Sequence, residues 1–282
     1  MESALSIRQL RVTFRTGLFR REVTALRGID LEVAPGEIAG ILGPNGSGKT
    51  SLLRVLAGLQ APTDGTARVL GRAPADPQLA QLVGFQPEAP VPMPFLTGRE
   101  YLLHVGWLLR MPAAEVPARA DELLEQLGLT AACSRQVRTW STGMQKRIGL
   151  AAALMSRPRV LLLDEPTSGL DPLGSRTIVE LLRTLAAEGT TVLLASHHLQ
   201  EVEELCQRVA VLHEGTLAAS GTLEQLLGRG DWELVLRGLD EAGVQRLQEL
   251  CTSLGAQVVS SSRAREHLFE LFRRIAQRGN GS

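Results

Sequence analysis

The hydrophobic pattern alternates between short apolar runs and stretches with helical spacing. Two runs, 159–163 and 190–195, are apolar almost throughout, which is typical of strands buried on both faces of a sheet. Similar apolar runs predict further strands, and helical spacing of the apolar residues between them predicts helices. The predicted strands are 5–14, 29–42 with a turn at 34–37, 66–70 and 82–85. The predicted helices are 51–58, two within 97–129, one at 142–155 and one that ends at Gly189.

This alternation of strands and helices predicts an α/β fold built on a parallel sheet. Ligands of such sheets bind at the carboxyl ends of the strands. Within 97–129, Thr97 is a suitable N-cap and Gly128 can end the second helix. The loop that begins at residue 43 and the acidic pair Asp164-Glu165 both follow predicted strands. We therefore expect the loop and the acidic pair to meet at one edge of the sheet.

The pattern changes after Gly228, which suggests a domain boundary. Alternation at 232–236 and 257–260 predicts short strands, and helical spacing at 244–254 and 268–275 predicts helices. We expect a main domain at 1–228 and a small C-terminal α+β domain of βαβα order at 231–282.

Composition narrows the classes of function. Thirty acidic and thirty basic residues give no net charge, which argues against nucleic acid as a partner recognised through bulk charge. No charge-free apolar stretch approaches the ~18 residues that a membrane span needs. The three cysteines lack C-x-x-C spacing, so neither a disulfide framework nor a zinc site is expected. These features favour a cytosolic protein.

The most specific chemical motif is a glycine-rich loop between a predicted strand and a predicted helix. It consists of Gly43, Pro44, Asn45, Gly46, Ser47, Gly48, Lys49 and Thr50, and it matches the pattern G-x-x-x-x-G-K-[ST]. The helix that starts at Ser51 points its positive end at bound phosphates, Lys49 can reach the outer phosphates, and the Thr50 hydroxyl can hold Mg²⁺. The alternative, a glycine-rich turn without a ligand, does not explain these flanking elements. Lys49 and Lys146 are the only lysines, against 28 arginines.

Further motifs follow in an order that resembles the ATP-binding subunit of ATP-binding cassette (ABC) transporters, from about residue 5 to 225. They are the glycine-rich loop, Gln86 within Val83-Gly84-Phe85-Gln86-Pro87-Glu88, Trp140-Ser141-Thr142-Gly143-Met144, the strand that ends in Asp164-Glu165-Pro166, Ser168-Gly169-Leu170-Asp171, and His197 within Ala195-Ser196-His197-His198. The resemblance implies a P-loop NTPase (RecA-like) core with an antiparallel β subdomain and an α-helical subdomain at about 90–157. It also implies ATP and Mg²⁺ as ligands.

Four residues receive roles at the phosphates. Asp164 can hold Mg²⁺ together with Thr50. By resemblance, Glu165 is the catalytic base, Gln86 contacts Mg²⁺ and water, and His197 hydrogen-bonds the γ-phosphate; with Lys49, Glu165 and His197 form the catalytic set. The alternatives are a strand-end cap for Asp164, a surface carboxylate for Glu165, an ordinary loop amide for Gln86 and a structural histidine for His197.

The segment 140–144 corresponds to the signature motif of the family, usually Leu-Ser-Gly-Gly-Gln, and departs from it at Trp140, Thr142 and Met144. By resemblance, Ser141 and Gly143 face the γ-phosphate bound by a second subunit, which implies a homodimer with two composite ATP sites. Met144 cannot donate the amide hydrogen bond of glutamine. Signatures with methionine resemble those of drug and polysaccharide exporters, which favours export.

Adenine usually stacks on an aromatic side chain in this family, and Phe14 is the best candidate, followed by Phe19. The alternative is that Phe14 belongs to the hydrophobic core. By resemblance, the groove between the helical subdomain and the Gln86 loop receives a helix of the permease, and Pro90, Pro92 and Pro94 would stiffen its rim.

The leading functional hypothesis is a Mg²⁺-dependent ATPase on the cytoplasmic face of the membrane that drives a separate permease. A soluble ABC-type ATPase acting on the ribosome or DNA is the alternative, disfavoured because the chain lacks a second cassette, a long heptad run and basic charge. A GTPase would need an Asn-Lys-x-Asp element, and Lys146 does not lie in one.

Overall fold

The computed structural model describes residues 3–16, 21–89, 93–227, 240–256 and 258. The chain divides into two compact units, 1–227 and 228–282. Within the second unit, helix α8 (Glu241–Ser253) is capped by Asp240, whose carboxylate accepts a hydrogen bond of 2.7 Å from the backbone N–H of Gly243. The prediction of a helix at 244–254 is thus confirmed. The strands predicted at 232–236 and 257–260, apart from Val258, and the helix predicted at 268–275 lie outside the described residues.

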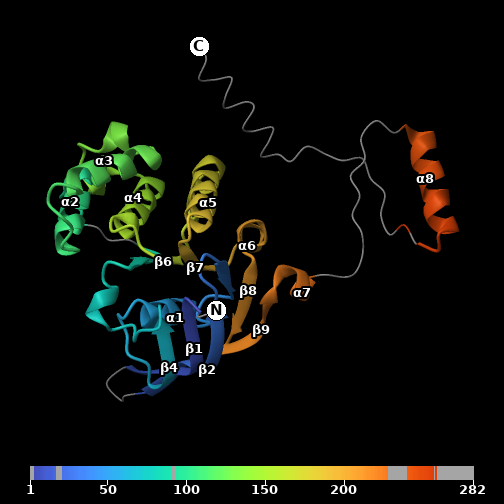
Figure 1. The fold of residues 1–282 in the computed structure, drawn as a ribbon, viewed down its shortest axis with the longest axis horizontal. Coiled ribbons are helices and arrows are strands. Elements are labelled where there is room, and N and C mark those ends of the chain that lie inside the picture. The colour runs from blue at the N-terminus through green and yellow to red at the C-terminus, as the bar shows by residue number, and fades with distance from the viewer. Residues whose placement is uncertain (1–2, 17–20, 90–92, 228–239, 257, 259–282) are drawn as a thin grey trace, which may run out of the picture. The chain divides into compact units, whose positions relative to one another are not determined.

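A six-stranded sheet forms the centre of the first unit (Figure 1). Its order is β5 (Val83–Gln86), β6 (Val160–Asp164), β7 (Thr191–Ser196), β3 (Ile38–Leu42), β8 (Arg208–His213) and β9 (Thr216–Thr222). All neighbouring strands are parallel except β8 and β9, which pair antiparallel. The predicted α/β fold with a parallel sheet is therefore confirmed, although the sequence pattern did not reveal β8 and β9.

Strands β6 and β7 are buried on both faces, as their continuous apolar runs predicted. Leu161 and Leu163 pack into a hydrophobic cluster with helices on one face, while Val160 and Leu162 pack into a second cluster on the other face. Each fully buried leucine contributes about 1.5–3 kcal/mol to folding. The strand ends at Asp164, which places this carboxylate at the carboxyl end of the parallel sheet.

Helix α1 (Lys49–Leu56) and a second sheet cover one face of the central sheet. The second sheet is antiparallel, with the order β2 (Arg21–Val33), β1 (Leu5–Thr16) and β4 (Asp64–Val69). This sheet agrees with the antiparallel subdomain that the family resemblance implied. Strand β2 starts at Arg21, eight residues before the start that was predicted at residue 29. The prediction began too late because exposed residues such as Glu22 and Arg27 interrupt the apolar pattern of the strand.

Three helices, α2 (Gly98–Leu108), α3 (Val116–Gln126) and α4 (Thr142–Leu154), pack side by side within the range expected for the helical subdomain (Figure 1). Thr97 caps α2 as predicted, in a reciprocal arrangement with Glu100. Gly128 follows α3 with a φ of +63°, which favours glycine. The remaining helical segments of the unit are α5 (Pro172–Ala187), α6 (Leu199–Leu205), α7 (Leu223–Leu227) and the short 3₁₀ turns Pro77–Leu79, Thr130–Ala132 and Val137–Thr139.

No helix in the described part of the chain combines the length and the apolar character needed to cross a membrane.

Candidate phosphate-binding and catalytic site

The glycine-rich loop joins β3 to α1 and is tightly held at both ends. A Cβ atom on Gly43 would lie 2.3 Å from the carbonyl oxygen of Leu212, and one on Gly48 would lie 2.6 Å from that of Ala25. Gly48 also has a φ of +108°. At the tip, by contrast, a Cβ on Gly46 would meet no atom within 4 Å. The loop is therefore anchored on neighbouring strands while its tip remains open to a ligand.

The first turn of α1 points at this open loop. Gly48 is the N-cap and offers no side chain to bond the first N–H groups of the helix. These N–H groups, together with the positive end of the helix dipole, form a site suited to an anion. The Ser47 hydroxyl, buried beside the loop, has no hydrogen-bond partner in the described structure. The arrangement fits the predicted cradle for phosphates.

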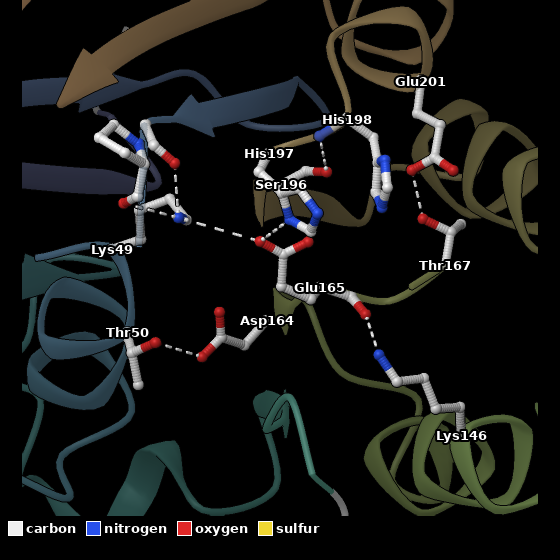
Figure 2. A network of polar contacts seen from close by, with 12 residues as sticks. Lys49, Thr50, Lys146, Asp164, Glu165, Thr167, Ser196, His197, His198 and Glu201 are labelled. Atoms are coloured by element: carbon white, nitrogen blue, oxygen red, sulfur yellow. Dashed lines mark hydrogen bonds and ion pairs between the residues drawn. The ribbon is translucent and has the colours of Figure 1, made fainter. Parts of the chain in front are cut away.

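Lys49 lies buried across the loop, with its side chain 7% exposed. Its Nζ donates hydrogen bonds to the carbonyl oxygens of Gly43 at 2.7 Å and Pro44 at 3.3 Å. The same nitrogen is 3.9 Å from Oε1 of Glu165 (Figure 2). The structure thus joins the predicted phosphate-binding lysine to the predicted catalytic base.

Thr50 and Asp164 form the pair expected for a magnesium site. The Thr50 hydroxyl donates a hydrogen bond of 2.7 Å to Oδ2 of Asp164 (Figure 2). Burial raises the pKa of Asp164 above its usual range, and the negative charges of Glu88 and Glu165 act in the same direction, whereas Thr50 and Lys49 oppose them. A buried carboxylate whose charge is poorly compensated favours the arrival of a cation.

Glu165 is held in an unusual backbone conformation directly after β6. Its φ is +51°, a left-handed value that costs a non-glycine residue about 1–2 kcal/mol. Its N–H donates to the carbonyl of Ala195 at 2.9 Å, and its own carbonyl accepts a hydrogen bond of 2.5 Å from Nζ of Lys146. Its carboxylate Oε1 lies 2.8 Å from Nδ1 of His197. These contacts hold a strained residue in place, as is common for catalytic groups.

Gln86, at the end of β5, is fully buried. Its Nε2 donates a hydrogen bond of 3.1 Å to the backbone carbonyl of Lys146. Several buried oxygen atoms around the loop lack a hydrogen-bond partner among the described residues, namely Ser47 Oγ, Gln86 Oε1, Asp164 Oδ1 and Glu165 Oε2. Buried oxygens without partners are rare in folded proteins, and oxygen atoms are the ligands that Mg²⁺ prefers. The residues present therefore fit a magnesium ion.

Two contacts connect α6 and the residues just before it with the segment that follows β6. The His197 side chain, 48% exposed, contacts Glu165, and its ring centroid is 4.0 Å from that of His198. The Thr167 hydroxyl donates a hydrogen bond to the carboxylate of Glu201 on α6 (Figure 2). His197 is thus close enough to orient the Glu165 carboxylate, and its contact with phosphate stays a prediction.

The signature segment forms the start of α4. Ser141 is exposed and caps the helix, since its Oγ accepts a hydrogen bond of 3.3 Å from the N–H of Met144. Trp140 is buried against Gly98, where an added Cβ would lie 2.3 Å from Cη2 of the indole. Gly98 therefore explains why tryptophan can stand where the family usually has leucine. The roles predicted for Ser141 and Gly143 in a second subunit's site stay predictions.

Phe14 lies on β1, half-buried, and packs against the cluster that contains α1 and the antiparallel sheet. This position agrees with the core alternative and leaves part of the ring accessible, so stacking on adenine stays a prediction. Phe19, Pro90 and Pro92 lie outside the described residues.

No motif of the sequence indicated a site role for Lys146. The structure buries it, at 6% exposure, with its ammonium group on the carbonyl of Glu165. Both lysines of the chain therefore contact Glu165. Their rarity beside 28 arginines was the feature of the sequence that could have identified the second one.

Comparisons with known proteins agree with this geometry. The profile of the family described as "ABC transporter" matches residues 26–168. An uncharacterized ABC transporter ATP-binding protein of Nostoc sp. is 37% identical over 96% of this chain and 89% of the relative. The Nod factor export ATP-binding protein I of Paraburkholderia xenovorans is 43% identical over 73% of this chain and 68% of the relative. The daunorubicin resistance ATP-binding protein DrrA3 of Streptomyces coeruleorubidus is 40% identical over 78% of this chain and 70% of the relative.

Solved structures show the same fold. An ATP-binding cassette in a dimeric post-hydrolysis state bound to ADP and Pi aligns with a TM-score of 0.71 and 26% identity, covering 78% of this chain and 98% of that protein.

Proposed function

The chain belongs to the ABC transporter family of ATP-binding proteins, and we propose that it couples ATP hydrolysis to export through a separate membrane permease. Members of this family bind and hydrolyse ATP, so the chain is an ATPase. The direction of transport is supported by the names of two relatives, which refer to Nod factor export and daunorubicin resistance. Hydrolysis would provide the energy, and the permease would select the substrate.

The observation that carries this proposal is the meeting of two distant segments at one edge of the sheet. Lys49 and Thr50 start α1, whereas Asp164 ends β6 and Glu165 follows it. The Thr50 hydroxyl contacts the carboxylate of Asp164, and the Lys49 ammonium group contacts that of Glu165. A phosphate cradle, an oxygen-rich cation site and a candidate base therefore lie within one constellation. This is the set of groups that phosphoryl transfer to water requires.

The residues divide the work at the phosphates. The loop N–H groups and Lys49 hold the triphosphate, and Thr50, Asp164 and Gln86 would hold Mg²⁺. A magnesium ion bound there would neutralise charge on the phosphate oxygens. Glu165 then accepts a proton from the attacking water at its carboxylate. His197, at 2.8 Å from that carboxylate, orients it and can also donate a hydrogen bond to the γ-phosphate.

A second copy of the chain would complete the site. The exposed Ser141 stands at the positive end of α4, and Gly143 follows it in the first turn. Both are suited to contact the γ-phosphate held by the partner's loop. Closure of such a dimer on ATP, followed by opening after hydrolysis, would provide the movement that the permease uses. Phe14 would support the adenine ring in this arrangement.

The permease would hold the protein at the cytoplasmic face of the membrane. The alternative, a soluble ABC-type ATPase acting on the ribosome or DNA, has no support from charge, because the chain is neutral overall.

Reconstitution with the permease tests the proposal. The chain would be co-expressed with a candidate permease, and the purified complex would be placed in liposomes. We expect ATPase activity to rise when the permease is present. We also expect substrate to accumulate inside those liposomes whose ATP-binding subunits face outward, and only when ATP is added. Activity that responds to ribosomes or DNA, and not to the permease, would contradict the proposal.

A further inference from the structure

Both lysines of the chain meet at a single residue, Glu165. Lys49 approaches from α1 and Lys146 from α4, as Figure 2 shows. We propose that Lys146 is a positioning residue for ATP hydrolysis, whose ammonium group holds the backbone carbonyl of Glu165 and thereby directs the Glu165 carboxylate. The inference rests on the ATPase function and assigns no direct contact between Lys146 and the nucleotide.

The backbone of Glu165 makes this contact consequential. The residue has a φ of +51°, and its peptide groups are held on both sides. On one side its N–H donates to Ala195 of β7, and on the other its carbonyl accepts the 2.5 Å hydrogen bond from Lys146. The rotamers that a side chain can adopt depend on the conformation of its backbone. Without Lys146, the carbonyl would keep only the longer contact of 3.4 Å with the N–H of Ser168 among its described partners.

The charge of Lys146 suits this position. Four carboxylates influence its ammonium group, namely Glu165, Glu88, Asp164 and Glu201. Burial lowers the pKa of Lys146 below its usual value, and these four negative charges act in the opposite direction. A buried cation is costly unless it is paired and hydrogen-bonded. Apart from Lys49 and Lys146, every basic residue that carries a fixed positive charge in this chain is an arginine. Arginine has a longer side chain with a planar fork of donors, whereas lysine ends in one compact ammonium group that can donate to a single carbonyl.

Lys146 also connects the helices to the catalytic strand ends. Its backbone carbonyl accepts the hydrogen bond from Gln86 at the end of β5, while its side chain reaches Glu165 at the end of β6. Strands β5 and β6 are neighbours in the sheet, with Gln86 paired to Leu163. A displacement of α4 would therefore act on Gln86 and on Glu165 through one residue. This arrangement provides a physical route by which the position of α4 can influence the catalytic carboxylate.

The test compares Lys146→Met with two other variants in the full-length protein. Methionine keeps the apolar length of the side chain and removes the donor and the charge. We expect kcat for ATP hydrolysis to fall at least about tenfold, with KM and ATP affinity changed less than about threefold, because misplacement of a catalytic group affects the chemical step. Lys146→Arg, which keeps a cationic donor, should lose less activity. The matched control is Arg147→Met, which removes a 2.9 Å hydrogen bond to the carbonyl of Leu127, away from Glu165.

A double variant separates positioning from a general structural effect. If Lys146 acts through Glu165, then Lys146→Met should not lower the residual rate any further in a Glu165→Gln background. A kcat within twofold of wild type in Lys146→Met, an equal loss in Arg147→Met, or a further loss in the double variant would overturn the proposal. Should Lys146→Met fail to fold, Lys146→Gln replaces it. Its uncharged amide ends one atom short of the lysine ammonium, so the hydrogen bond to the Glu165 carbonyl should weaken, and kcat should again fall more than ATP affinity. A wild-type protein without ATPase activity would instead contradict the proposed function.

Discussion

The Thr50 hydroxyl donates a 2.7 Å hydrogen bond to Oδ2 of Asp164, a residue 114 positions later in the chain. Thr50 lies in the first turn of α1, and Asp164 is the last residue of β6. The bond therefore joins the predicted phosphate-binding loop to the strand that precedes the candidate catalytic base. It also leaves the other Asp164 oxygen, Oδ1, buried without a partner in the described structure, where a cation can bind it.

Replacing Thr50 with valine tests this pair. Valine has nearly the same shape but leaves the buried Asp164 oxygen without its donor, so the free energy of unfolding should decrease by about 1–3 kcal/mol. The concentration of Mg²⁺ that gives half-maximal ATPase activity should increase. Urea unfolding and a magnesium titration measure the two effects.

The control for Thr50→Val is Thr177→Val on α5. The Thr177 hydroxyl donates to the carbonyl of Leu173 at an exposed position, so this variant should change stability by no more than about 0.5 kcal/mol. If both variants are equally stable and respond equally to Mg²⁺, the assignment of Thr50 to the cation site is wrong.

Replacing Glu165 with glutamine tests the base. Glutamine keeps the shape but cannot accept the proton, so turnover should fall by roughly 100-fold or more while ATP still binds. Phosphate release measures turnover, and size-exclusion chromatography with ATP should reveal a stable dimer. Glu203→Gln, an exposed change on α6, should behave like wild type. Normal turnover in Glu165→Gln would exclude Glu165 as the base.

The raised pKa of Asp164 predicts a pH dependence of stability in the absence of nucleotide and metal. Its usual pKa is 3.8, and burial raises the value in the folded state. Between pH 3.8 and the folded-state pKa, the folded protein binds more protons than the unfolded chain. The contribution of Asp164 to stability is therefore complete below pH 3.8 and is lost as the pH rises through the folded-state pKa.

Asp164→Asn removes this titration. The stability of wild type relative to Asp164→Asn should therefore decrease from about pH 4 toward neutral pH, as measured by urea unfolding at each pH. A difference that stays constant or grows with pH would contradict the direction of the pKa shift.

Gly98 and Trp140 allow a test of the unusual signature. Alanine at 98 would bring its Cβ within 2.3 Å of the buried indole, so Gly98→Ala should decrease the free energy of unfolding by about 1–3 kcal/mol. Trp140→Leu in the Gly98→Ala background should recover part of that loss, because the smaller side chain relieves the contact. Thermal unfolding of the two single variants and the double variant measures the coupling.

The control for this pair is Gly174→Ala in the first turn of α5. Its Cβ would lie 3.3 Å from Oδ1 of Asp171, the N-cap carboxylate that accepts a 2.7 Å hydrogen bond from the N–H of Gly174, so a shift of only a few tenths of an ångström is needed. Alanine favours a helix, so we expect little loss or a small gain in stability. If the effects of Gly98→Ala and Trp140→Leu on the free energy of unfolding are additive, the two positions are not energetically coupled and the expected recovery is excluded.

Features encoded by adjacent residues could be predicted from the sequence. The loop 43–50, the doubly buried β6 and β7, and the cap at Thr97 each depend on a short segment whose pattern is visible in the chain. Strand β2 was predicted too short and β8 and β9 were missed, because pairing with other strands stabilises residues whose own pattern is weak.

The sequence by itself therefore determined the chemistry of this protein: a phosphate loop, an acidic pair after a buried strand, and the order of motifs that identified the family. Only the tertiary structure decided which groups meet. It brought Thr50 to Asp164, Lys146 to the carbonyl of Glu165 and Trp140 to Gly98. These contacts join residues 19 to 114 positions apart, and their geometry depends on how strands and helices pack. Periodicity reports which face of an element is buried, but not which side chain lies opposite.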